Sequence, residues 1–199
     1  MMKTFKMYLE FTRKSFQRSA AYRVDSWSRI IGNIMSLGIW GCIWFALYHG
    51  HDSVENISFQ SMLSYILISM ALQGIHNAGT PLWEIQHRVR TGDIAFEMLR
   101  PYDYPLRMLF TDLGSISFHF VTAILPLYIV IFALFQPDIP LSASQWGLFI
   151  LSAALGYLIR YSLELTFGLF TFWLIETGGV EDVFYFSISL FSGSVVPLW

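Results

Sequence analysis

Residues 83–107 read WEIQHRVRTGDIAFEMLRPYDYPLR, a charged block between two long hydrophobic stretches. The block holds four of the twelve Lys and Arg residues of the chain. Seven others precede the first hydrophobic stretch, and the last is Arg160. In membrane proteins the cytoplasmic loops carry such an excess of Lys and Arg. The block therefore predicts a membrane protein and also predicts which of its loops face the cytoplasm.

The composition agrees with a membrane protein. The 199 residues are 55% hydrophobic and 13% charged, whereas soluble domains are about 25% charged. The mean hydropathy is +0.52. A net charge of −2 argues against a protein that binds nucleic acid, because such proteins carry a strong basic excess. The single cysteine, Cys42, excludes an intrachain disulfide and a cysteine-cluster metal site.

The hydrophobic stretches predict an all-α fold, a polytopic bundle of transmembrane helices that forms one membrane domain. A membrane span needs about 20 apolar residues. Pro126 lies inside the third stretch and predicts a kink, which transmembrane helices tolerate. The five predicted spans are 30–48, 59–78, 113–135, 146–173 and 183–199.

Residues 1–29 are basic and amphipathic, and they predict a helix in the headgroup plane of the membrane. The alternative is a solvated leader helix. The loops 49–58 and 136–145 contain no Lys or Arg and are expected outside. The amino terminus and the block 83–107 are then cytoplasmic, in a multi-pass protein of the cytoplasmic (inner) membrane. By alternation the turn 174–182 should also lie inside, although it has no Lys or Arg.

Arg160 and Glu164 are the charges deep within an apolar stretch, and their spacing of four places them on one helix face. Ser152, Gly156 and Gly168 continue the same series. One interpretation is a polar stripe that lines a pathway or a subunit interface. The other, which we prefer, is that Arg160 extends to the inner headgroups with Glu164 as its local partner.

The block itself predicts a helix–turn–helix. Residues 83–90 form the first helix, Thr91-Gly92-Asp93 is a break, and residues 94–99 form a second helix capped by Asp93. Two interpretations are open: a docking element for a soluble partner, or an amphipathic segment on the membrane surface.

Motifs of enzymes are absent from the sequence. It has no GxxxxGK[ST] phosphate loop, no H-E-x-x-H and no nucleophile elbow. We therefore expect no catalytic residue, no bound cofactor and no metal site in this chain. His49 and His51 of the first outer loop, with Asp52, are too few for a closed metal site.

The stretch Gly92-Asp93-Ile94-Ala95-Phe96-Glu97-Met98-Leu99-Arg100-Pro101 resembles a motif of permease subunits of ABC-2 type ATP-binding cassette transporters. The terminal stretch Phe191-Ser192-Gly193-Ser194-Val195-Val196-Pro197-Leu198 is similar to the segment of this family near the outer end of helix five. The resemblance covers nearly the whole chain. The family has six helices, and this sequence ends at Trp199 in or just after the fifth.

The resemblance implies a permease that works with other subunits, with export as the expected direction. Two permease subunits, identical or related, pair in the bilayer, and two cytosolic ATPase subunits carry ATP and Mg. Residues 3–23 correspond to the amphipathic connecting helix of the family, and the block holds its coupling helix. The alternative is a membrane scaffold or assembly protein without transport activity. The residues expected to couple to the ATPase are Glu84, Arg88, Arg90, Gly92, Asp93, Glu97, Arg100 and Pro101.

Overall fold

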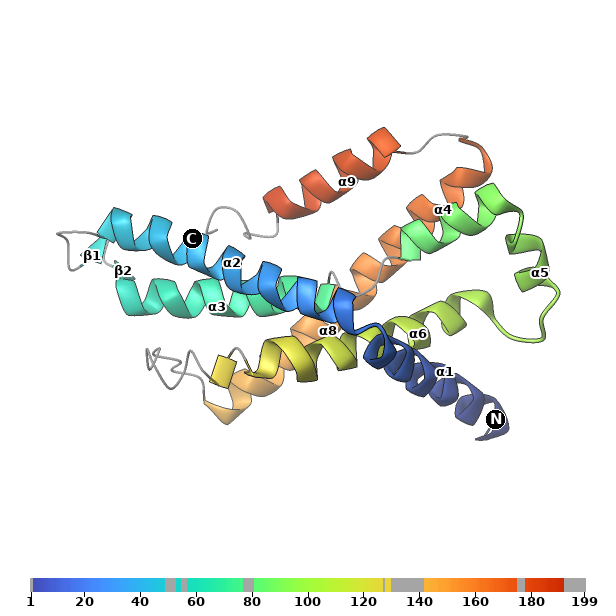
Figure 1. The fold of residues 1–199 in the computed structure, drawn as a ribbon, viewed down its shortest axis with the longest axis horizontal. Coiled ribbons are helices and arrows are strands. Elements are labelled where there is room, and N and C mark those ends of the chain that lie inside the picture. Colours follow the sequence, from blue (N-terminus) through green and yellow to red (C-terminus); the bar gives the residue numbers. More distant parts are fainter. Residues whose placement is uncertain are drawn as a thin grey trace.

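The computed structural model describes residues 2–48, 53–54, 57–76, 81–126, 128–129, 142–174 and 178–191. Within these residues the protein is an all-α helical membrane bundle with one small pair of strands (Figure 1). The elements are α1 (Met2–Ala21), α2 (Arg23–Tyr48), β1 (Ser53–Val54), β2 (Ile57–Ser58), α3 (Phe59–His76), α4 (Pro81–Thr91), α5 (Ile94–Met98), α6 (Tyr104–His119), the π-helix η1 (Phe120–Ile124), α8 (Ala143–Leu169), the 3-10 helix η2 (Phe170–Phe172) and α9 (Gly178–Phe191).

Two helices in the described ranges are long and apolar enough to cross a membrane, at Ile30–Tyr48 of α2 and at Ser144–Phe172 of α8 with η2. The apolar parts of α3 and α9 are shorter. Several predicted segments fall wholly or partly outside the described residues. These are 49–52 with His49, His51 and Asp52, residues 130–135 of the third stretch, residues 136–141 of the second outer loop, 175–177, and the terminal stretch from Ser192 onward.

α2 and α3 form an antiparallel helical hairpin, drawn side by side in Figure 1. Tyr48, Met62 and Ile66 are its buried apolar side chains. At its tip β1 and β2 pair antiparallel, with Ser53 opposite Ser58. This ribbon lies in a segment that the sequence predicts as a polar loop.

α4, α6 and α8 share the second buried cluster, Ile85, Met108 and Tyr161. α4 lies along the carboxyl-terminal half of α8 because Gly168 leaves room for it. A Cβ at Gly168 would lie 2.8 Å from the Cδ1 atom of Ile85. The Tyr161 hydroxyl donates a 2.5 Å hydrogen bond to the carbonyl oxygen of Pro105, which fixes the start of α6 on α8.

α6 begins at Tyr104, nine residues before the predicted span, because Arg107 and Asp112 kept these first turns out of that span. Asp103 caps it, since its Oδ1 accepts a 3.0 Å hydrogen bond from the Leu106 N–H. The π-helix η1 lies just before Pro126, where the sequence predicts a kink. Proline disturbs the preceding helical turn, because it cannot donate a hydrogen bond and its ring crowds that turn. The kink itself stays a prediction.

The predicted leader helix 1–29 is divided. α1 ends at Ala21, and residues from Arg23 onward belong to α2. Likewise α9 begins at Gly178, inside the predicted turn 174–182.

One face of α1 packs on α6, which the sequence prediction of a headgroup-plane helix did not include. The Thr12 hydroxyl donates a 2.7 Å hydrogen bond to the Phe110 carbonyl oxygen, and the Ser15 and Ser115 hydroxyls are 3.0 Å apart. Gly114 permits this close crossing, since a Cβ there would overlap the Thr12 carbonyl oxygen.

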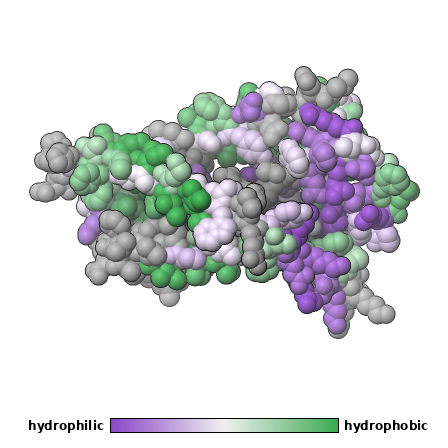
Figure 2. All heavy atoms as spheres, viewed as in Figure 1, coloured by the Kyte–Doolittle hydropathy of each residue, from purple (hydrophilic) through white to green (hydrophobic). Residues whose placement is uncertain are grey.

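Polarity divides the molecule along its long axis (Figure 2). On the face shown, hydrophilic residues gather where α1 and α4 lie in Figure 1, and hydrophobic residues gather toward the α2–α3 end. The charged block thus lies at the polar end, opposite the β1–β2 ribbon.

We expect the Gly114→Ala variant to lose about 1–3 kcal/mol of unfolding free energy, because the added methyl group forces α1 away from α6. Thermal unfolding of the purified protein in detergent measures this loss. The control is Gly38→Ala in α2, where a Cβ would meet no described atom within 4 Å. Helix propensity alone should make that variant slightly more stable. Equal stability of the two variants would contradict the close crossing.

Candidate functional site

The turn between α4 and α5 brings the two halves of the charged block together. Gly92 has φ +78°, in the left-handed region that favours glycine, and its N–H donates to the Val89 carbonyl oxygen at 3.2 Å. This confirms the predicted break. Asp93 stands at the N-cap position of α5, as predicted, but its side chain makes no capping hydrogen bond. Its side chain instead accepts a 3.0 Å hydrogen bond from the Thr91 hydroxyl, within the turn.

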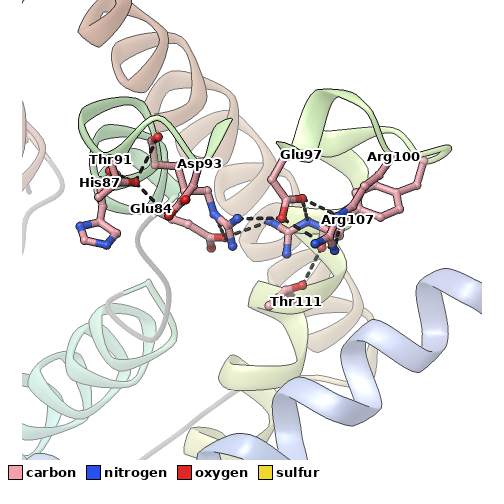
Figure 3. Close-up of polar contacts among 10 residues, drawn as sticks. Glu84, His87, Thr91, Asp93, Glu97, Arg100, Arg107 and Thr111 are labelled. Atoms are coloured by element: carbon pink, nitrogen blue, oxygen red, sulfur yellow. Dashed lines mark hydrogen bonds and ion pairs between the residues drawn. The ribbon is translucent and has the colours of Figure 1, made fainter. Parts of the chain in front are cut away.

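Six polar side chains from α4, α5, the following turn and α6 form one network, which we call the ion cluster (Figure 3). Arg107 of α6 bridges the other two helices. Its Nη2 donates to the Glu84 Oε1 of α4 at 2.9 Å, and its Nε lies 3.4 Å from the Glu97 Oε2 of α5. The members of the ion cluster are Glu84, Arg88, Glu97, Arg100, Tyr102 and Arg107.

Glu97 is the most enclosed member, with 5% of its surface exposed. Its Oε1 accepts from the Arg88 Nη1 at 2.7 Å, and its Oε2 accepts from the Tyr102 hydroxyl at 2.6 Å. Arg88 also donates from Nε to the Glu84 Oε1 at 3.0 Å, so Arg88 and Arg107 each contact both carboxylates.

The ionisation of the cluster follows from these contacts. Burial raises the pKa of Glu97, but the Tyr102 hydrogen bond and the charges of Arg107, Arg88 and Arg100 together outweigh it, so the net pKa is lowered. Burial lowers the pKa of Arg107, and the hydrogen bond and charge of Glu84 reverse this, so its pKa is raised. Both groups therefore stay charged at neutral pH.

Arg100 lies at the edge of the cluster. Its side chain is 57% exposed, and its Nη1 is 4.0 Å from the Glu97 Oε1. It also donates a 3.3 Å hydrogen bond to the Tyr102 hydroxyl. Arg100 is thus a cation that faces solvent at the edge of the ion cluster.

Half of the residues expected to couple to a partner enter the ion cluster, namely Glu84, Arg88, Glu97 and Arg100. The others surround it. Arg90 is exposed near the end of α4, Gly92 and Asp93 form the turn, and Pro101 is exposed after α5. Sequence reasoning did not single out Tyr102 and Arg107. One sequence feature could have indicated Arg107. Pro105 is favoured in the first turn of a helix, so Arg107 is a charged residue near the start of one.

The outer side of α5 is apolar. Phe96 is 68% exposed, Met98 67% and Leu99 83%, and we call these three residues the apolar tip. Figure 2 shows a hydrophobic patch at the end of the molecule where Figure 1 places α5, with hydrophilic residues between it and the hydrophobic end.

The predicted stripe on α8 is divided into two parts. Glu164 is 1% exposed and lies 2.5 Å from the Arg160 Nη2, and Gly168 packs on Ile85. Ser152 and Gly156 are exposed, and a Cβ at Gly156 would meet no described atom within 4 Å. The carboxyl-terminal end of the stripe, at Gly168, therefore packs on α4, whereas Ser152 and Gly156 at its amino-terminal end are exposed.

The ion cluster links α4, α5 and α6, and the apolar tip stays exposed beside it. Among the described residues, no group of three or more His, Cys, Asp or Glu is placed to hold a metal ion.

A family model described as ABC-2 family transporter protein matches residues 35–198. The match includes the whole ion cluster and the apolar tip, and it begins within α2, after α1. No curated protein and no solved structure gives a match.

We expect Glu97→Gln to lower the unfolding free energy by about 3 kcal/mol, because it leaves buried guanidinium groups without their carboxylate. Chemical or thermal unfolding in detergent measures the loss. Glu10→Gln is the matched control, since Glu10 pairs with Arg13 at 3.5 Å on an exposed face. That change should cost below about 1 kcal/mol. Similar losses in both variants would show that the ion cluster does not stabilise the fold.

Acid should weaken the same cluster. The pKa of Glu97 is lower in the folded state than its ordinary value of 4.5, so its contribution is complete above that value and is lost as the pH falls through the folded pKa. Between about pH 5 and pH 3 the wild-type protein should lose stability more steeply than Glu97→Gln. Parallel pH profiles of the two proteins would contradict the lowered pKa.

Proposed function

Since the chain belongs to the ABC-2 transporter family, we propose that this membrane-embedded permease exports a substrate across the cytoplasmic membrane, driven by a separate cytosolic ATPase. The observation that carries the proposal is the ion cluster. It joins the charged block, where the ATPase would bind, to α6, a helix of the membrane bundle.

The proposed orientation places the polar end in the cytoplasm. Seven Lys and Arg residues precede residue 30 and four lie in the block, whereas the segment around the β1–β2 ribbon has none. Because α5 and the ribbon lie at opposite ends of the molecule (Figure 1), the block would face the cytosol and the ribbon the outside. The amino terminus is cytoplasmic in this arrangement, and the chain crosses the membrane several times.

Nucleotide chemistry would take place on the partner. The sequence has no phosphate-binding loop, so ATP and Mg would bind to the ATPase subunit. A second permease subunit, identical or related, would complete the pathway in the bilayer. Nucleotide binding on the ATPase would then favour one of two conformations of the permease pair, which differ in the side to which the pathway opens.

The helices that would move together are those tied by buried contacts. A displacement of α5 would reach α6 through the ion pair of Glu97 and Arg107, because this pair is charged and enclosed. α1 would follow α6 through the hydrogen bond from Thr12 to Phe110. The block is thus a rigid extension of the bundle, and force applied to it is not absorbed by the glycine turn.

The test is reconstitution of the permease with its ATPase in liposomes, with the rate of ATP hydrolysis as the readout. We expect the wild-type permease to stimulate the ATPase. Glu97→Gln, assayed at a temperature where it stays folded, should reduce the stimulation about fivefold, which corresponds to about 1 kcal/mol of coupling. The control Glu10→Gln should stimulate as the wild type does.

Two results would count against the proposal. Full stimulation by folded Glu97→Gln would show that the ion cluster does not carry coupling. A wild-type permease without any effect on the ATPase would contradict the proposed function and would favour a scaffold or assembly role.

A further inference from the structure

We propose that Asp112 of α6 and Tyr157 of α8 are positioning residues that transmit a movement of α6 to α8 during transport. The inference rests on the proposed function and adds α8 to the helices that move together. We call this contact, together with the hydrogen bond from Tyr161 to Pro105, the α6–α8 joint.

The contact between Asp112 and Tyr157 is short and polar. The Tyr157 hydroxyl donates a hydrogen bond to the Asp112 Oδ2 at 2.6 Å, between residues 45 positions apart in sequence. A hydroxyl-to-carboxylate bond of this length is charge-assisted and about twice as strong as a bond between neutral groups. Because water competes little for such a bond between helices of a membrane bundle, the bond holds the two helices firmly together.

The second bond of the joint lies about two turns back along α6. There the Tyr161 hydroxyl donates to the Pro105 carbonyl oxygen at 2.5 Å. Pro105 and Asp112 are seven positions apart, which is about 10 Å along a helix axis. One bond alone could serve as a pivot, whereas two bonds at different levels oppose both sliding and rotation of α8 against α6.

Side chains, rather than close backbone packing, bridge these two helices. The described backbones of α6 and α8 are not packed closely along their length. The tyrosines of α8 span the gap, and Met108 of α6 packs against Tyr161. Apolar helices gain little from leaving lipid for each other, because lipid tails are as apolar as their side chains. The position of α8 relative to α6 therefore depends on the polar bonds of the joint.

Charges connect the joint with the ion cluster. Asp112 lies five positions after Arg107 on the same helix, so a shift at Arg107 moves Asp112 as well. The charge of Glu84, a member of the ion cluster, acts on the Asp112 carboxylate. The charge of Arg160, which pairs with Glu164 at 2.5 Å, acts on it from α8. The joint thus continues the charged network from the block into the bundle.

α8 can carry the movement across the membrane. Together with η2 it is long and apolar enough to span the bilayer. Its carboxyl-terminal half is held by the joint and by the packing of Gly168 on Ile85, whereas Ser152 and Gly156 in its amino-terminal half are exposed. A displacement of the held half would therefore tilt the exposed half, as in the rigid-body movements that open a pathway to one side.

Two tyrosine variants test the joint after reconstitution with the ATPase in liposomes. Tyr157→Phe removes the hydrogen bond to Asp112 and should reduce the maximal stimulation of ATP hydrolysis about fivefold. Tyr104→Phe is the matched control, because the buried Tyr104 hydroxyl makes no hydrogen bond with the described residues. This control should stimulate the ATPase as the wild type does.

Two further readouts separate positioning from a loss of fold. Tyr157→Phe should bind the ATPase with wild-type affinity, because the charged block is intact, whereas a misfolded permease would bind it more weakly. Asp112→Asn keeps an acceptor for the Tyr157 hydroxyl and should keep the stimulation within about twofold of the wild type. Asp112→Ala has no acceptor and should behave as Tyr157→Phe does.

A reversible cross-link tests whether α6 and α8 move as one body. In a Cys42→Ser background, which lacks the native cysteine, Asp112→Cys and Tyr157→Cys are combined. A short bifunctional thiol reagent that a reductant cleaves then joins the two positions. Before the reaction the double variant should stimulate the ATPase as weakly as Tyr157→Phe. The cross-link should restore the stimulation, and the reductant should remove it again.

Other results would overturn the inference. If Tyr157→Phe and Tyr104→Phe stimulate equally, or if the cross-link blocks stimulation or fails to restore it, the joint does not transmit the movement, and the proposed function stands. If the cysteine variant does not fold, the comparison of the two tyrosine variants decides alone. A wild-type permease that does not stimulate the ATPase would contradict the proposed function and the inference together.

Discussion

The guanidinium of Arg107 lies between two carboxylates that come from two other helices, Glu84 of α4 and Glu97 of α5. Removing such charges from water costs several kcal/mol for each ion, and this cost is offset only when all partners are in place. The three helices therefore take their positions together. With Arg107 absent, the remaining arginines could not bind both carboxylates from the side of α6. α5 would then lose its charged contact with α6, and α4 would keep only its apolar packing on α6 and α8.

The contacts that position the other helices continue from Arg107 along α6. The next residue, Met108, packs with Ile85 and Tyr161, so the charged contact and the apolar contact of α4 begin within one turn of α6. Two residues further on, the Phe110 carbonyl oxygen accepts the hydrogen bond of the Thr12 hydroxyl of α1. α6 is thus in contact with α1 on one side and with α4 and α8 on the other, and it carries the geometry of the polar end into the apolar part of the molecule.

Sequence patterns predicted the local features of this arrangement. Hydrophobic length predicted the positions of α2, α3 and α8. The glycine at position 92 predicted the break between α4 and α5, since a left-handed residue is needed there. The start of α6 was missed because its first turns, which contain Arg107 and Asp112, lower the local hydropathy.

The tertiary pairs could not be predicted from the same patterns. Glu84 and Arg107 are 23 positions apart, and no periodicity links them. Thr12 meets Phe110 across 98 positions. Helical spacing did place Arg160 and Glu164 on one face of α8, but it could not show that the stripe is covered by α4 at one end and open at the other. The position of Asp93 before α5 was predicted, but not that its side chain accepts from the Thr91 hydroxyl instead of a backbone N–H of α5.

The π-helix η1 changes which residues of the third predicted stretch share a helix face. In η1 the Leu125 N–H donates to the Phe120 carbonyl oxygen, five positions back, so this turn contains one residue more than an α turn. The described residues after it, 125, 126, 128 and 129, are rotated by about 100° about the axis, relative to an α-helix counted on from α6. In evolutionary terms η1 is equivalent to a one-residue insertion. Deletion of a single residue within it would be expected to restore the α-helical hydrogen-bond spacing.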